Sequence, residues 1–188
     1  MGNTQKVAAG LRLLYMGNIV ALAATLCTLL AFLIPPLVLV TAFVVLVGAT
    51  MCLVGLVKLN SEHDAYTYAL LATVAGIICS LFSRGDGLLA DLLDLAGSVC
   101  SLLQVYFVIQ GTNSFLLAGG FQEQAEMGRR AWKWQIISLA VSAAVLLLAL
   151  TVVLAPLALA GAWANVVVGI IGLVFYLSYL KASTAVLS

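Results

Sequence analysis

Charged residues are scarce in this chain, and their scarcity excludes most classes of soluble protein. Of the 188 residues, 8% are charged and 64% are hydrophobic. A soluble domain carries roughly a quarter charged residues, and a soluble protein this apolar could not cover its surface with polar groups. In a bilayer the same composition is expected, because apolar side chains face hydrocarbon while the backbone hydrogen-bonds within helices. The chain is therefore predicted to be an all-α, polytopic integral membrane protein.

The sequence also lacks a basic excess and any spacing typical of metal ligands. Its net charge is +1, so the sequence has no excess of basic residues that would indicate a nucleic-acid partner. The only histidine, His63, lies between Glu62 and Asp64, without the second histidine or thiolate that a zinc site needs. It is interpreted as part of a solvated turn. The four cysteines form no C-x-x-C pair and are expected to pack as small apolar side chains: Cys27, Cys52, Cys79 and Cys100.

Catalytic motifs are missing as well. No phosphate-binding glycine loop, nucleophile elbow or metalloprotease helix can be found in the sequence. We therefore expect no enzyme activity, no catalytic residue, no metal and no cofactor.

Only three prolines are present, and they fall at breaks between long apolar runs. A membrane-crossing helix needs roughly 20 apolar residues, so the chain has room for about six spans in one transmembrane domain, residues 1–188. The spans, arranged as three consecutive hairpins, are predicted near residues 11–34, 37–58, 66–83, 88–116, 134–155 and 160–181. The longest connection, from Ala118 to Lys133, is predicted as a loop able to form an amphipathic helix on the inner membrane surface.

The distribution of basic residues predicts the orientation. With both termini in the cytoplasm, Arg84 is the one basic residue on the outer side. The other seven lie inside, as the positive-inside rule requires: Lys6, Arg12, Lys58, Arg129, Arg130, Lys133 and Lys181. A multi-pass protein of a plasma membrane, of compact bacterial design, is expected.

Polar residues within the fourth predicted span are the candidate binding site. Asp91, Asp94, Ser98 and Ser101 fall within a narrow arc of a helical wheel, and Gln104 flanks it. One interpretation is a polar cavity open to the outside, with Asp94 facing the bundle interior, which admits a cation or a small polar solute. The other is an amphipathic helix start whose aspartates lie in the interface, favoured there by the helix dipole.

Small and polar residues also recur at spacings of three and four in several spans, which is typical of helices that pack closely in lipid. The first three stripes comprise Asn18, Ala21, Thr25 and Thr28; Thr41, Gly48, Cys52 and Gly55; and Ala69, Thr73, Gly76 and Ser80. These stripes are interpreted as packing surfaces.

Two functions remain open. The first is a non-catalytic membrane subunit or interaction protein that contacts the lipid bilayer and either another membrane protein or a second copy of itself. The alternative is a small-solute or cation carrier, or the substrate-binding membrane component of a transporter.

In size and topology the chain resembles the substrate-binding components of energy-coupling-factor vitamin transporters, which implies the second function. Their first helix carries an Ala-x-x-x-Ala docking motif, where this sequence has Ala21-x-x-x-Thr25. Their ligand-gating outer loop corresponds here to Pro35-Pro36 alone.

Overall fold

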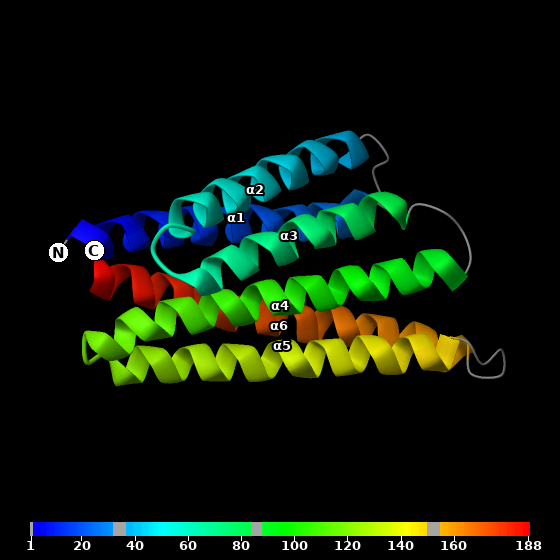
Figure 1. The fold of residues 1–188 in the computed structure, drawn as a ribbon. Helices are drawn as coiled ribbons and strands as arrows, with labels where there is room; N and C mark the ends of the chain where they lie inside the picture. The colour runs from blue at the N-terminus through cyan, green and yellow to red at the C-terminus, as the bar shows by residue number, and fades with distance from the viewer. Residues whose placement is uncertain (1, 32–36, 84–87, 150–154) are drawn as a thin grey trace.

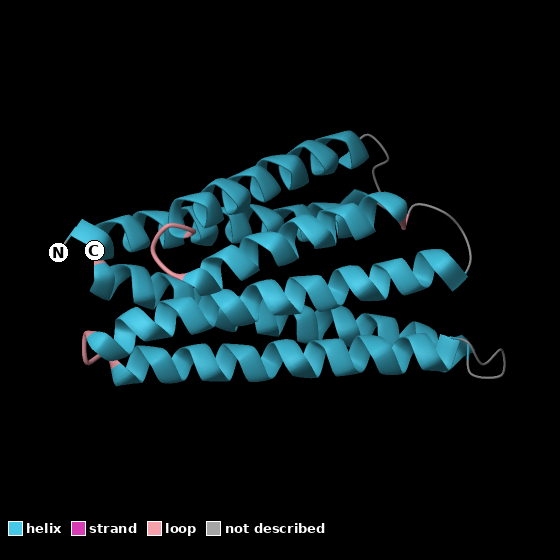
Figure 2. Cartoon of the chain, viewed as in Figure 1, coloured by secondary structure: helices cyan, strands magenta, loops and turns pink. Residues whose placement is uncertain are grey.

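The fold is all-helical, as the composition predicts. The structure, a computed structural model, describes residues 2–31, 37–83, 88–149 and 155–188. These residues contain no strand (Figures 1 and 2). Their helices are α1 (Gly2–Ala31), α2 (Leu37–Leu59), α3 (Asp64–Phe82), α4 (Leu88–Ala118), α5 (Gln122–Ala149) and α6 (Ala155–Leu187). The residues that connect the first two predicted spans, Pro35-Pro36, and those that connect the third and fourth, 84–87, lie outside the described residues.

The six helices form a ring of neighbours. Consecutive helices pack most extensively in the pairs α1–α2, α3–α4 and α5–α6. Contacts of α1 with α6 and of α4 with α5 join these hairpins, and α2 and α3 make the lightest contact around the ring. Both termini lie at the same end of the bundle (Figure 1).

Five of the helices are long and apolar enough to cross a membrane. The qualifying segments are Thr4–Cys27, Leu39–Leu59, Asp64–Phe82, Leu92–Ala118 and Trp163–Leu187. These helices agree with the prediction of a membrane protein. The insertion of the chain into a membrane and its orientation there stay predictions. The fifth predicted span, near 134–155, also stays a prediction, because it overlaps α5 but continues into residues 150–154, which the structure does not describe.

The segment from Ala118 to Lys133, predicted as a loop able to form a helix on the membrane surface, is mostly helix, and this helix is the start of α5. Gly120 ends α4 with a φ of 81°, in the left-handed region that glycine tolerates. The Phe121 amide donates to the Leu116 carbonyl at 2.8 Å and the Gly120 amide to that of Leu117 at 3.1 Å, the two bonds of a Schellman cap. Because α5 begins directly afterwards, the basic residues Arg129, Arg130 and Lys133 stand on a helix that belongs to the bundle.

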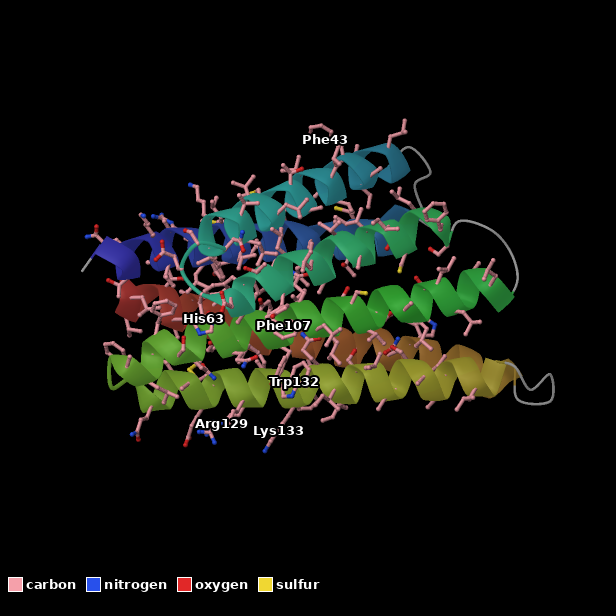
Figure 3. All side chains as sticks on the ribbon, viewed as in Figure 1. Phe43, His63, Phe107, Arg129, Trp132 and Lys133 are labelled. Carbon is pink, nitrogen blue, oxygen red and sulfur yellow. The ribbon has the colours of Figure 1, made fainter. Side chains whose placement is uncertain are left out.

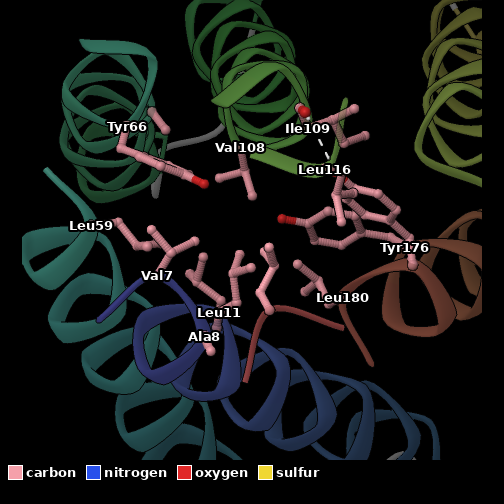
Figure 4. Packing of buried hydrophobic residues seen from close by; sticks show 14 of the residues in the cluster. Val7, Ala8, Leu11, Leu59, Tyr66, Val108, Ile109, Leu116, Tyr176 and Leu180 are labelled. Atoms are coloured by element: carbon pink, nitrogen blue, oxygen red, sulfur yellow. Dashed lines mark hydrogen bonds between the residues drawn. The ribbon is translucent and has the colours of Figure 1, made fainter. Parts of the chain in front are cut away.

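A close-packed hydrophobic core seals the end of the bundle where the termini lie. Its largest fully buried side chains are Tyr66, Tyr176 and Tyr179, surrounded by leucine and valine from α1, α2, α4 and α6 (Figure 4). Towards the other end, large apolar side chains instead point outwards. Leu39 is 80% exposed and Phe43 is 68% exposed (Figure 3). This combination suits a bundle whose outer surface faces hydrocarbon.

Glycines hold α1 and α2 unusually close together. A Cβ atom built on Gly17 would lie 2.9 Å from the Gly48 carbonyl oxygen, and one on Gly55 would lie 3.0 Å from that of Gly10. Helices in lipid associate through such small residues because their backbones can approach closely. Gly48 and Gly55, from the predicted stripe of the second span, thus form a packing surface.

Candidate functional site

Of the five predicted site residues, Ser98 and Ser101 line one hollow and Gln104 lines another. The Ser98 hydroxyl donates to the main-chain carbonyl of Asp94 at 3.1 Å, and the Ser101 hydroxyl to that of Gly97 at 3.1 Å. The Asp94 side chain is exposed, and the side chain of Asp91 is outside the described part. A cavity mouth marked by these two carboxylates therefore stays a prediction.

Ser98 and Ser101 face a small polar hollow between α4 and α5, with a volume of about 180 Å³. Gln135, Ser138 and Ser142 of α5 also line it. The Ser142 hydroxyl lies 3.0 Å from the Asn165 Oδ1 of α6 and can donate to it. The hollow therefore lies between α4 and α5, and Ser142 connects its wall to α6.

Gln104 lines a different and larger cavity, of about 600 Å³. Five helices contribute to its wall, since the lining residues come from α1, α2, α3, α4 and α6. They are Asn18, Ala21, Ala24, Thr25, Val45, Gly48, Ala49, Cys52, Thr73, Ile77, Gln104 and Val166. None of these side chains is charged.

Two carboxamides are the polar groups available to a ligand in this cavity. Asn18 Nδ2 donates to the Leu14 carbonyl at 2.8 Å and lies 3.7 Å from Cys52 Sγ, while its Oδ1 bonds to no other described group. The Gln104 carboxamide makes no hydrogen bond to any described residue. The Thr25 and Thr73 hydroxyls donate to carbonyls of their own helices at 3.0 and 2.8 Å, which leaves them as acceptors.

The buried tyrosines close the bundle next to this cavity, and Cys52 both lines the cavity and packs against the core. The hydroxyl of Tyr66 lies 3.0 Å from Thr112 Oγ1, which connects α3 to α4. Tyr179 donates to Asn113 Oδ1 at 2.9 Å, and Asn113 Nδ2 donates to the Ala125 carbonyl at 3.4 Å. These bonds join α3, α4, α5 and α6, so hydrogen bonds as well as apolar packing hold the closed end of the bundle together.

Tyr176 differs from its two neighbours. It is 1% exposed, and among the described residues its hydroxyl finds no hydrogen-bond partner. Figure 4 shows Tyr66 and Tyr176 reaching into the core from opposite sides.

His63 serves as a helix cap. Its Nδ1 accepts a hydrogen bond from the Ala65 amide at 3.0 Å, at the N-terminus of α3. The ring meets Phe115 edge-on, with centroids 6.3 Å apart. Within the described residues, no group of three or more histidine, cysteine or acidic side chains could hold a metal ion.

Sequence reasoning placed Asn18, Cys52 and Thr73 in packing stripes and did not foresee that they surround a cavity. The available signal was that the stripes of the first three spans all contain hydrogen-bonding side chains at mid-span. Ala21 and Thr25, which stand where the vitamin-transporter components carry a docking motif, also line this cavity. No known family model, no curated protein and no solved structure matches the chain.

Proposed function

We propose that this chain is a non-catalytic integral membrane protein that binds a small solute in the cavity among its helices, as a carrier or as the binding component of a transporter. The observation that carries the proposal is the cavity of about 600 Å³ walled by five helices. Small-molecule sites typically have volumes of roughly 300–1,000 Å³, apolar walls and a few placed polar groups.

The lining indicates the chemical class of the solute. A cation at this depth would need carboxylates or a dense set of oxygen ligands. No carboxylate is among the residues that line the cavity. The carboxamides of Asn18 and Gln104 can each donate and accept. The proposed ligand is therefore uncharged and mostly apolar, with one or two groups that hydrogen-bond to an amide.

The orientation and location are part of the proposal. With both termini in the cytoplasm of a bacterial cell, the tyrosine core would close the inner side of the plasma membrane and the cavity would lie nearer its middle. In a cysteine-free background, Gly85→Cys should react with an impermeant thiol reagent in intact cells, whereas Gln122→Cys should react only after lysis. Labelling of Gln122→Cys from outside would overturn this orientation.

Cysteine accessibility in proteoliposomes tests whether the cavity holds water and solute. Thr73→Cys, on the cavity wall, should react with a small hydrophilic methanethiosulfonate. Two variants serve as controls and should stay unmodified: Phe43→Cys faces lipid, and Ala69→Cys lies in the sealed core. A bound solute, found by screening uncharged, mostly apolar amides, should slow the reaction of Thr73→Cys.

The competing function, a membrane subunit that acts only through contacts with other proteins, gives the opposite result. A cavity without such a role can stay dry, so Thr73→Cys would be as unreactive as Phe43→Cys. That outcome would remove the support for solute binding.

A further inference from the structure

A groove between α4 and α5 has a different character from the central cavity. It lies near the end of the bundle where the termini are, and its volume is about 390 Å³. Its polar lining includes Arg129, Gln110 and Ser114, and its apolar lining includes Tyr106, Leu117 and Trp132. A site with one cationic side chain beside apolar and aromatic walls suits an amphiphile that carries a negative charge.

The charge of Arg129 is free to bind an anion. Within the residues that the structure describes, the one ion pair joins Lys6 Nζ and Glu62 Oε1 at 3.7 Å. Glu126, one turn before Arg129, therefore forms no ion pair with it. Arg130 and Lys133 are likewise exposed and without a carboxylate partner in that part of the chain. Together with Glu123 and Glu126, the charged side chains at the start of α5 leave a small net positive charge.

A row of aromatic rings marks the level of this groove in the membrane. Trp132 of α5 lies against Tyr106 of α4, with ring centroids 4.9 Å apart. Phe107 continues the row to Tyr68 of α3, with centroids 5.4 Å apart. Such belts sit at the boundary between hydrocarbon and headgroups. Arg129, three residues before Trp132, lies about 4.5 Å further towards the termini, on the headgroup side.

We propose that this groove binds an anionic phospholipid. The lipid phosphate pairs with the Arg129 guanidinium and accepts a hydrogen bond from the Gln110 carboxamide, while an acyl chain runs past Trp132 and Tyr106 into the hydrocarbon. Guanidinium groups bind phosphate oxygens in a planar, two-pronged geometry. This inference rests on the membrane insertion proposed above but not on the central cavity. Lipid binding in the groove and solute binding in the cavity can therefore fail independently of each other.

Quenching of tryptophan fluorescence by brominated lipids tests the proposal. Trp132 is made the only tryptophan by Trp134→Phe and Trp163→Phe, and the protein is reconstituted in phosphatidylcholine. Brominated phosphatidylglycerol should then quench with an affinity about tenfold above that of brominated phosphatidylcholine, which corresponds to about 1.4 kcal/mol. Arg129→Gln should abolish this preference. The matched control is Arg130→Gln, which removes the same charge from the neighbouring position outside the groove, and it should retain most of the preference.

Three outcomes would overturn the proposal. Equal quenching by the two lipids would mean that the groove does not select a charged headgroup. An equal effect of Arg129→Gln and Arg130→Gln would assign the preference to the general surface charge. A change in Trp132 fluorescence on addition of inorganic phosphate, but not of chloride at the same ionic strength, in a protein that shows no preference for brominated phosphatidylglycerol, would show a site for free phosphate instead of a lipid. Thermal unfolding of each variant without added anionic lipid checks that the fold is retained.

Discussion

Gly17→Ala should destabilise the protein, although alanine is the better helix former. A Cβ atom at this position would lie 2.6 Å from Cys52 Sγ, 2.9 Å from the Gly48 carbonyl oxygen and 3.0 Å from the Cys52 amide nitrogen. The sulfur can rotate away, but two of these atoms belong to the backbone of α2, so the helices must separate. Overpacking of this kind costs about 1–3 kcal/mol, against a gain of about 1 kcal/mol in helix propensity. The difference is a net loss of up to about 2 kcal/mol.

Gly169→Ala is the matched control, because it makes the same chemical change within α6. The nearest atom to its added Cβ would be Ser138 Oγ, at 3.8 Å, which is ordinary contact. This variant should therefore be neutral or more stable. Unfolding of both variants in mild detergent, followed by circular dichroism during titration with dodecyl sulfate, measures the difference. If Gly17→Ala and Gly169→Ala unfold at the same midpoint, the close approach of α1 and α2 at Gly17 is refuted.

Two further predictions use the same unfolding assay. His63→Ala should lower the free energy of unfolding by about 1 kcal/mol through loss of the cap, whereas His63→Asn should recover most of it by supplying another acceptor. Equal losses in the two variants would contradict the capping role. Tyr179→Phe should cost about 1 kcal/mol because it removes the hydrogen bond to Asn113, while Tyr176→Phe should change stability little because that hydroxyl has no partner in the described residues. A reversed order of the two phenylalanine variants would show that the hydrogen bonds are wrongly assigned.

The helical architecture could be predicted because it depends on local hydrophobicity. Long apolar runs require helices in lipid, and their lengths follow from the thickness of the bilayer. The start of α5 was harder to predict, because charges from Glu123 to Lys133 suggested a loop. The Gly119-Gly120 pair was the better signal: a glycine that accepts a left-handed conformation can reverse the chain within three residues.

The candidate site depends on which helices meet, and that information is not local. Gln104 was identified by its place beside a polar arc of one helix, yet the groups that share its cavity, Asn18 and Thr73, come from α1 and α3. A stripe of small residues has the same spacing whether it touches a neighbouring helix or borders a hollow. Gly48 does both, since it packs on Gly17 and lines the cavity.

The light contact between α2 and α3 has a consequence for how a solute would travel. Val45 of α2 and Ile77 of α3 both line the cavity, and both are exposed, at 50% and 37%. Separating α2 from α3 breaks fewer contacts than separating the two helices of any of the three hairpins. A lipid-soluble compound already dissolved among the acyl chains would therefore have a sideways entrance between α2 and α3 and would reach Asn18 and Gln104 without first passing through water.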